Sequence, residues 1–426
     1  MRFALVTLGS TGDLYPFLAI GRALREQGHE VFLLSQAPYR ADADRAGLQF
    51  VPVVDATAHA RTLSHPKLWH PVDGLGVFWR HLCLPAARPT WEALRHLAAP
   101  LTPAQPLRVL ASPLAVGARL ARDTTPLRLW SAYLAPAALR NLDDPMFLGP
   151  WAVPNWIPQG LRKAAWRALD RWKLEPMARQ ALCDLASATG AQPPHGSVFG
   201  DWIHSPDGGL ALYDASFAPL PQRLAGALDN LRCEGSMTQV GFPNFEWEVP
   251  RPLASRNWPP RPWLLFGGSA GTLDSQRLAQ ALAQQTGRAC IVLGSARQPK
   301  EPASENGVIS LPAQALPPLL WETHAFVHHG GIGSCAQGLA AGIPQLLIPQ
   351  AYDQFENAAA IQRMGAGVAM PPAVTRRSPE EQVAWISAQA AHLTSCARAP
   401  QAREAYSLPG APNAAVRAAV GILTAP

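Results

Sequence analysis

Residues 3–34 read FALVTLGSTGDLYPFLAIGRALREQGHEVFLL. The apolar run Phe3–Leu8 ends in a turn rich in glycine, after which apolar residues recur at helical spacing until Gly28. A second apolar run, Val31–Leu34, follows at once. A strand, a glycine turn, a helix and a second strand in this order indicate a βαβ unit, from which parallel sheets are built.

The same alternation restarts beyond residue 262, after a segment of six prolines without helical period at 241–262, which we interpret as a linker. Apolar runs then predict strands, with helices between them, at Trp263–Phe266, Ala289–Leu293, Val308–Leu311, Ala325–His328 and Gln345–Ile348. We therefore predict an α/β protein in which two doubly wound parallel-sheet domains, at 1–240 and 263–410, face each other across a cleft. We expect a last helix at 411–426, packed back on the N-terminal domain.

Composition limits the class of protein. With 48% hydrophobic and 15% charged residues in 426, the chain has the composition of folded domains. Its net charge of +6 is spread along the sequence, which gives no reason to expect a nucleic acid partner. The six cysteines are widely spaced, which favours free thiols in a reducing compartment. Because no apolar stretch approaches the roughly 18 residues that span a bilayer, we expect a cytoplasmic protein, with peripheral contact at the inner face of the membrane left open.

The segment HHGGIGS, residues 328–334, lies between a predicted strand and a predicted helix. Its three glycines let the backbone approach a ligand closely, and the helix N-terminus offers free N–H groups and a partial positive charge that suit a diphosphate. His329 and Ser334 add side-chain donors. A tight turn without a ligand is the alternative. Because neighbouring residues of a strand point to opposite faces, His328 and His329 cannot chelate one metal ion together.

Twenty residues after His329 the chain reads PQAYDQFEN, residues 349–357. Asp353 and Gln354 place a carboxylate beside an amide, and Asn357 lies one helical turn further on. Together such groups accept hydrogen bonds from, and donate them to, neighbouring hydroxyls, as sugar recognition requires. Taken alone, the segment is better explained by a helix that has Asp353 as its N-cap and presents a solvated face.

Together the two segments resemble the nucleotide-sugar signature of family 1 glycosyltransferases, which have the two-domain GT-B fold. Gly9-Ser10-Thr11-Gly12-Asp13 resembles the first-strand loop of bacterial members that use an aspartate base, and Gly267-Gly268-Ser269 resembles the loop that opens their donor domain. Weaker similarity at 65–69 and 204–206 most resembles the catalytic chain of rhamnolipid rhamnosyltransferases.

The resemblance implies a role for each matching residue. The donor diphosphate would be held by His329, Gly330, Gly331, Gly333, Ser334 and, from the facing loop, Ser269. Asp353 and Gln354 would contact the sugar hydroxyls, and Asn357 would support the donor pocket. Neither a metal nor a cofactor is expected, because the helix dipole and His329 would stabilise the leaving diphosphate.

Asp13 matches the position of the catalytic base. Its carboxylate would take the proton of the acceptor hydroxyl as that oxygen attacks the anomeric carbon, with inversion of configuration. The alternative is a helix N-cap, for which aspartate is also favoured. Other positions depart from the family: Gln337 replaces a glutamate that contacts the ribose, Ser310 a tryptophan that stacks on the base, and Ser112 the acid of a His–Asp dyad. The choice between uridine and thymidine is therefore open, and Asp13 would act alone.

The expected activity is transfer of a sugar from a nucleoside diphosphate donor, of the dTDP-rhamnose or UDP-glucose type, to a hydroxyl of a lipophilic acceptor. This acceptor would be a hydroxy-fatty-acid lipid or a hydrophobic aglycone, since nine of the 14 tryptophans precede residue 240. A GT-B sugar epimerase and a non-catalytic subunit that binds nucleotide sugars are the alternatives. The basic, tryptophan-containing stretch 161–182 fits either an anionic membrane surface or a solvated helix face.

Overall fold

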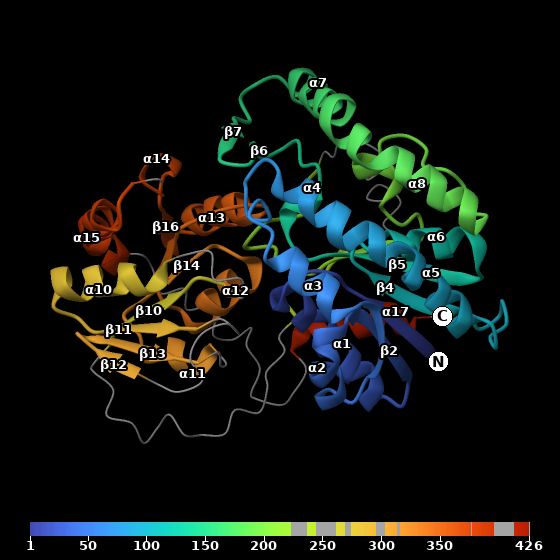
Figure 1. The fold of residues 1–426 in the computed structure, drawn as a ribbon, viewed down its shortest axis with the longest axis horizontal. Helices are drawn as coiled ribbons and strands as arrows, with labels where there is room; N and C mark the ends of the chain where they lie inside the picture. Colours follow the sequence, from blue (N-terminus) through green and yellow to red (C-terminus); the bar gives the residue numbers. More distant parts are fainter. Residues whose placement is uncertain are drawn as a thin grey trace. The chain divides into compact units, whose positions relative to one another are not determined.

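The computed structural model describes residues 1–222, 237–243, 261–268, 274–294, 303–312, 316–375, 377–395 and 413–425. The chain forms two compact units, which are described separately (Figure 1). The first comprises Met1–Gly9, Asp13–Phe245 and Ala414–Pro426, and the second Ser10–Gly12 and Glu246–Asn413. Most of the predicted linker, residues 244–260, lies outside the described residues.

In the described part of the first unit, seven strands form a parallel sheet in the order β3-β2-β1-β4-β5-β8-β9. Phe3 of β1 pairs with Val31 of β2 on one side and with Arg108 of β4 on the other. Side chains of such central strands are buried on both faces, which explains their continuous apolar runs. The strands are β1 Arg2–Val6, β2 Glu30–Gln36, β3 Gln49–Val54, β4 Leu107–Ala111, β5 Leu127–Tyr133, β8 Gly209–Ala211 and β9 Met237–Gln239.

Helices surround this sheet, and α5 packs directly on α6. A Cβ atom at Gly117 of α6 would lie 2.1 Å from the carbonyl oxygen of Ala87 in α5, so this contact needs a glycine. A separate antiparallel pair, β6 Met146–Leu148 and β7 Trp151–Val153, precedes α7. The helices are α1 Thr11–Glu26, α2 Arg40–Arg45, α3 Ala56–Leu63, α4 Gly74–Phe78, α5 Leu84–Ala98, α6 Val116–Thr124, α7 Gln159–Leu169, α8 Glu175–Thr189 and α17 Ala414–Thr424.

Helix α17 comes from the end of the chain and belongs to the first unit. The guanidinium of Arg108, a buried residue of β4, donates hydrogen bonds to the carbonyl oxygens of Leu423, at 2.6 Å, and Ala425, at 2.5 Å. Arg108 thus joins a central strand to residues more than 300 positions later in the sequence.

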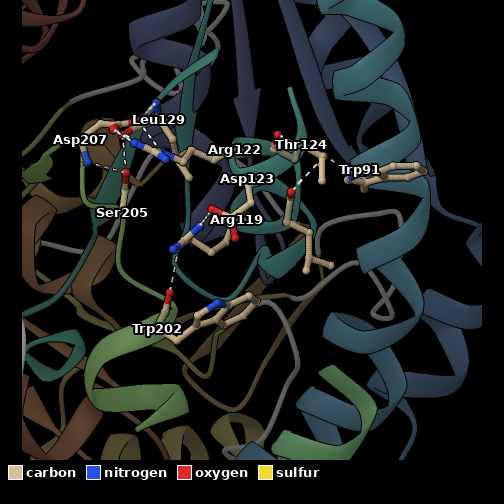
Figure 2. A network of polar contacts seen from close by, with 11 residues as sticks. Trp91, Arg119, Arg122, Asp123, Thr124, Leu129, Trp202, Ser205 and Asp207 are labelled. Carbon is tan, nitrogen blue, oxygen red and sulfur yellow. Dashed lines mark hydrogen bonds and ion pairs between the residues drawn. The ribbon is translucent and has the colours of Figure 1, made fainter. Parts of the chain in front are cut away.

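A network of polar contacts fixes α6 to β5 and to the segment that precedes β8 (Figure 2). The carboxylate of Asp207 accepts from Arg122 of α6, at 2.6 Å, and from the backbone N–H of Leu129 in β5, at 3.1 Å. The hydroxyl of Ser205 donates to the carbonyl oxygen of Leu129 at 2.6 Å, and Arg119 donates to that of Trp202 at 3.1 Å. These contacts give the segment 202–207 a structural role.

The second unit contains a second sheet, of order β12-β13-β11-β10-β14-β15-β16, in which only β12 runs antiparallel to its neighbour among the described strands. Its strands are β10 Trp263–Phe266, β11 Cys290–Leu293, β12 Ala303–Glu305, β13 Val308–Leu311, β14 Ala325–His328, β15 Gln345–Leu347 and β16 Gly367–Ala369. Its helices are α10 Ser275–Thr286, α11 Pro317–Leu320, α12 Ile332–Ala341, α13 Gln354–Arg363, α14 Pro372–Thr375 and α15 Pro379–Ser395.

Two Rossmann-like α/β sheets confirm the predicted fold class. Among the described residues, no helix combines the length and hydropathy that crossing a membrane requires.

Candidate functional site

The loop after β1 brings the predicted base, Asp13, against the backbone of Gly9. Gly9 has a φ of +145°, and a Cβ atom there would lie 2.3 Å from Oδ2 of Asp13, so only glycine leaves room for the carboxylate. Asp13 lies in the first turn of α1 and is half-buried. Its carbonyl oxygen accepts a hydrogen bond from the hydroxyl of Thr7 at 3.1 Å. The carboxylate thus has a defined position at the carboxyl end of the sheet.

Residues of β2 and the turn after it hold this loop, and sequence reasoning missed them. The carbonyl oxygen of Gly9 accepts from Nε2 of Gln36, at 2.7 Å, and from the hydroxyl of Tyr39, at 3.0 Å. Ser35, which is fully buried, donates to the carbonyl oxygen of Thr7 at 2.8 Å. Two polar residues, Ser35 and Gln36, end an otherwise apolar strand, and this pattern could have revealed them. The carboxyl ends of neighbouring parallel strands meet at one edge of the sheet, so polar residues there are expected near the loop after β1.

In the second unit, His328 at the end of β14 holds the glycine loop. Its Nδ1 accepts from the backbone N–H of Gly330 at 3.1 Å, and its Nε2 donates to Oε1 of Gln345 at 2.9 Å. Burial, reinforced by the neighbouring His329, lowers the pKa of His328 to about 3, so the ring is neutral. Gln345 is also fully buried and donates to the carbonyl oxygen of Cys335 at 3.3 Å. His328 therefore stabilises the conformation of the glycine loop by accepting a hydrogen bond from the backbone of Gly330.

The ring of His329 lies between two glycines. A Cβ atom at Gly268, which has a φ of +86°, would lie 2.9 Å from Cε1 of His329, and one at Gly331 would lie 2.5 Å from its Nε2. Burial lowers the pKa of His329 to about 4, although a hydrogen bond with the backbone of Phe266 opposes this shift. Its Nδ1 is buried and has no hydrogen-bond partner within the described part of the chain. Since the ring is neutral at pH 7, it can present this nitrogen to a ligand.

Helix α12 begins directly after the glycine loop. Gly331 occupies its N-cap position with extended backbone and, being a glycine, supplies no capping side chain. Ser334 is buried in that turn. A Cβ atom at Gly333 would meet no atom of the described residues within 4 Å, so contacts among them do not require this glycine. The N-terminal end of α12 therefore offers an anion free backbone N–H groups and space in which to bind.

Asn357 joins the glycine loop to Asp353. Its Nδ2, which is fully buried, donates to the carbonyl oxygen of Gly330 at 3.0 Å and to Oδ2 of Asp353 at 2.7 Å. Asp353 precedes α13, but its side chain makes no capping hydrogen bond. Its carboxylate instead accepts from the residue one turn along the helix. The structure thus brings together three of the predicted donor-site residues.

Gln354 is buried, with 3% of its surface exposed. Its Oε1 accepts from the backbone N–H groups of Gln350, at 2.7 Å, and Ala351, at 3.1 Å. These bonds support the turn in which Tyr352 adopts a φ of +55°. With Oε1 engaged in this way, Nε2 is the atom of Gln354 through which the predicted sugar contact would run.

The other predicted positions have separate surroundings. Ser269 lies outside the described residues. Oε1 of Gln337 is buried without a partner in the described regions, and the hydroxyl of Ser310 donates to Oε1 of Gln276 at 3.1 Å. The backbone N–H of Ser112 donates to the carbonyl oxygen of Val6 at 2.9 Å. The described side chains include no group of three histidine, cysteine or acidic residues placed to hold a metal ion.

Two family models match the chain. Residues 3–81 match the N-terminal domain of glycosyltransferase family 28, and residues 310–416 match the C-terminal domain of the erythromycin biosynthesis protein CIII-like family. The second match includes the glycine loop, α12 and α13. The O-mycaminosyltylonolide 6-deoxyallosyltransferase of Streptomyces fradiae is 26% identical to this chain, over 98% of this chain and 96% of its own length.

Solved structures agree with this similarity. Glycosyltransferase VinC in complex with dTDP matches with a TM-score of 0.64 at 19% identity, over 99% of this chain and 98% of that chain. The spinosyn rhamnosyltransferase SpnG complexed with thymidine diphosphate matches with a TM-score of 0.61 at 16% identity, over 99% and 100%. The chain is thus similar to glycosyltransferases of family 28 in its N-terminal part and of the erythromycin CIII-like type in its C-terminal part, and its fold is the two-domain GT-B fold.

Proposed function

We propose that the chain is a metal-independent, inverting glycosyltransferase that moves a sugar from a nucleoside diphosphate donor to a hydroxyl of a lipophilic acceptor. dTDP-rhamnose is the first candidate donor and UDP-glucose the second. The thymidine diphosphate in two similar structures and the 6-deoxyallosyl group transferred by the similar Streptomyces enzyme support this choice. A hydroxy-fatty-acid lipid or a hydrophobic aglycone is the proposed acceptor.

One observation carries the proposal: a buried polar atom, Nδ1 of His329, lies without a partner in the described residues, next to the N-terminus of α12, where the N-cap residue is a glycine. A diphosphate supplies what both lack: its oxygens accept from the helix N–H groups, and its negative charge would draw a proton to Nδ1 of His329, which then donates to it. Ser334 and the amides of Gly330, Gly331 and Gly333 complete the proposed diphosphate site, with Ser269 as a predicted further contact. Asp353 and Nε2 of Gln354 would then bind the sugar hydroxyls.

Charge on the diphosphate increases as the glycosidic bond breaks. Fixed donors that are already oriented stabilise this charge without reorganising, and they are strong where water is excluded. Asp13 would meanwhile accept the proton of the attacking hydroxyl, held in position by Gly9 and the β2 residues behind it. Attack from the side opposite to the leaving nucleotide inverts the anomeric centre.

The first test is a screen of donors. We expect dTDP to raise the melting temperature more than UDP or GDP, since a ligand at a hundredfold excess over Kd adds roughly 2.7 kcal/mol to the free energy of unfolding. The enzyme should then form a glycosylated product from dTDP-rhamnose and a 3-hydroxy fatty acid lipid, and mass spectrometry would detect this product. Activity should persist in excess EDTA.

His329→Ala tests the site itself. It should lower kcat/KM by about 10²-fold or more, as expected for a lost contact to transition-state charge. Unchanged kinetics with both dTDP and UDP sugars would contradict the assignment of the diphosphate site. Binding of the diphosphate without turnover of any donor would favour the non-catalytic subunit, and interconversion of UDP-N-acetylglucosamine with its epimer would favour the epimerase.

A further inference from the structure

Large apolar side chains are exposed in one short stretch of the first unit. Trp151 of β7 is 59% exposed, Trp156 in the following loop 78%, Leu161 of α7 62%, and Trp172 in the helical turn Asp170–Leu174 77%. These four residues, here called the tryptophan face, lie within 22 consecutive positions on and before the helical arm of α7 and α8 (Figure 1). Single exposed apolar residues are common, but three tryptophans of this exposure in one segment are not.

The helix places the apolar residues on one side. Leu161 and Trp172 are 11 positions apart, and the α-helix between them passes into a single π-helical turn at Asp170–Leu174, so the two side chains lie about three turns apart on roughly the same side. Ala164 and Ala168 lie between them on this side, and Ala164 is exposed. Arg167 and Arg171, both exposed, flank the stripe. The result is an apolar stripe with an arginine row beside it.

Both acidic residues of this stretch are paired with arginines. Both carboxylate oxygens of Asp170 accept from Arg140, at 2.5 and 2.6 Å, in a pair that is almost fully buried. Glu175 accepts from Arg179 at 2.5 Å. Only one of the six basic residues in 161–182, Arg179, takes part in these two ion pairs.

A second basic residue of the stretch is also turned inward. Arg162 is buried and donates to the carbonyl oxygens of Ile157 and Asp144. The basic residues that remain toward solvent are Lys163, Arg167, Arg171 and Lys173. Within the described regions, neither Arg167 nor Arg171 forms an ion pair, so the outer surface of this arm is cationic as well as apolar.

Lys173 extends the face to another segment of the chain. Its Nζ donates to the carbonyl oxygen of Val72 at 2.6 Å, and Val72 is itself 38% exposed. Two parts of the sequence about 100 positions apart therefore contribute to one surface.

We propose that the tryptophan face docks on the surface of an anionic lipid bilayer. Tryptophan is enriched where hydrocarbon meets water, because its ring is apolar and its N–H is polar. Arginine and lysine beside such rings attract anionic headgroups. Protein interfaces also concentrate tryptophan and arginine, so a second copy of the chain is the alternative occupant that the experiment separates. The inference goes beyond the proposed function and does not depend on it.

Co-sedimentation of the full chain with vesicles tests the proposal. We expect binding to vesicles of phosphatidylcholine mixed with phosphatidylglycerol, weaker binding to phosphatidylcholine alone, and release at high salt. The double variant Trp156→Ser/Trp172→Ser should lose most of this binding. Arg171→Glu should lower the partition coefficient by more than about fivefold, since each basic residue near such a surface contributes roughly that factor.

Control variants elsewhere on the surface show whether a loss of vesicle binding is specific to the tryptophan face. Trp321→Ser removes a tryptophan of similar exposure, 63%, from the second unit, and Arg61→Glu reverses an exposed charge on α3. Both should bind vesicles as the unaltered chain does, and all variants should keep its melting temperature. The proposal is wrong if no anionic vesicle sediments the chain, if neutral vesicles bind it equally well, or if the control variants lose as much binding. It is also wrong if the double variant binds vesicles normally but has a lower molecular mass by light scattering. The tryptophan face would then join two copies of the chain.

Discussion

The side-chain amide of Asn357 donates a hydrogen bond of 3.0 Å to the carbonyl oxygen of Gly330, 27 positions earlier in the chain. The same nitrogen donates to Asp353 at 2.7 Å. One buried side chain therefore fixes both the loop proposed for the diphosphate and the carboxylate proposed for the sugar. Asn357 can therefore position the groups proposed to bind the donor without contacting the donor itself.

Asn357→Ala should destabilise the protein. The substitution leaves the Gly330 carbonyl and the Asp353 carboxylate without this donor, and a buried group deprived of its partner costs about 1–3 kcal/mol. Urea unfolding should show a loss in this range. Asn155→Ala, at an exposed loop position, is the control and should change the free energy of unfolding little. Equal stability of the two variants would mean that Asn357 does not hold the loop.

Gly333→Ala separates ligand contact from folding. Because a Cβ atom at Gly333 meets no atom of the described residues within 4 Å, we expect unchanged or slightly higher stability, as alanine favours helices over glycine by about 1 kcal/mol. Donor KM should nevertheless rise at least about tenfold, because the methyl group would occupy space next to the helix N-terminus. Gly421→Ala in α17, where a Cβ atom is equally free, should leave KM unchanged. An unaltered KM in both variants would place the donor elsewhere.

Asp13→Asn tests the proposed base. Asparagine keeps the size of the side chain but cannot take a proton at neutral pH, so the transfer rate should fall by about 10²–10⁴-fold. The melting temperature should fall only slightly, since Asp13 lies in the first turn of α1, past the N-cap position, where a carboxylate gains about 0.3–1 kcal/mol from the helix dipole. Asp55→Asn is the matched control, because Asp55 caps α3 by accepting from the N–H of Ala58 at 2.8 Å. An active, stable Asp13→Asn variant would remove Asp13 from the mechanism.

Acid should destabilise the first unit through His204. This histidine lies against Tyr133, whose hydroxyl is 3.1 Å from its Nδ1, and burial lowers its pKa to about 4. An unfolded histidine binds a proton below about pH 6.5, which the folded ring does not bind until about pH 4. The free energy of unfolding should therefore fall as the pH decreases from 6.5 toward 4, and above 6.5 the contribution is fully present.

The measurement is urea unfolding at a series of pH values, with a probe in the first unit. His204→Gln should show a shallower decrease, because glutamine does not titrate. His195→Gln, at an exposed position, should follow the unaltered chain. A slope that is the same in all three proteins would exclude His204 as its source.

The sequence predicted the bounds of β10, β13 and β14 as the structure has them, because each is a short, mainly apolar run of four residues between polar or glycine-containing segments. Strands such as β8 and β16 were missed, since each has three residues including a glycine and forms only through its partner in the sheet. At the site, the glycines and Asp353 were evident locally. The hydrogen bonds of Gln36, Tyr39 and Gln345 were not, because their partners are more than ten positions away and only the fold brings them together.

The bonds from Arg108 to α17 have a consequence for biosynthesis. A central strand of the first unit carries a buried guanidinium whose acceptors, at Leu423 and Ala425, are translated more than 300 residues after it. Domains usually fold as their segments leave the ribosome, N-terminal part first. Here the first unit cannot complete its fold until the whole second unit has been translated. Until then Arg108 lacks the carbonyl groups that accept its hydrogen bonds. Nascent chains stalled before residue 414 should therefore be recognised by chaperones and proteases far more readily than finished ones.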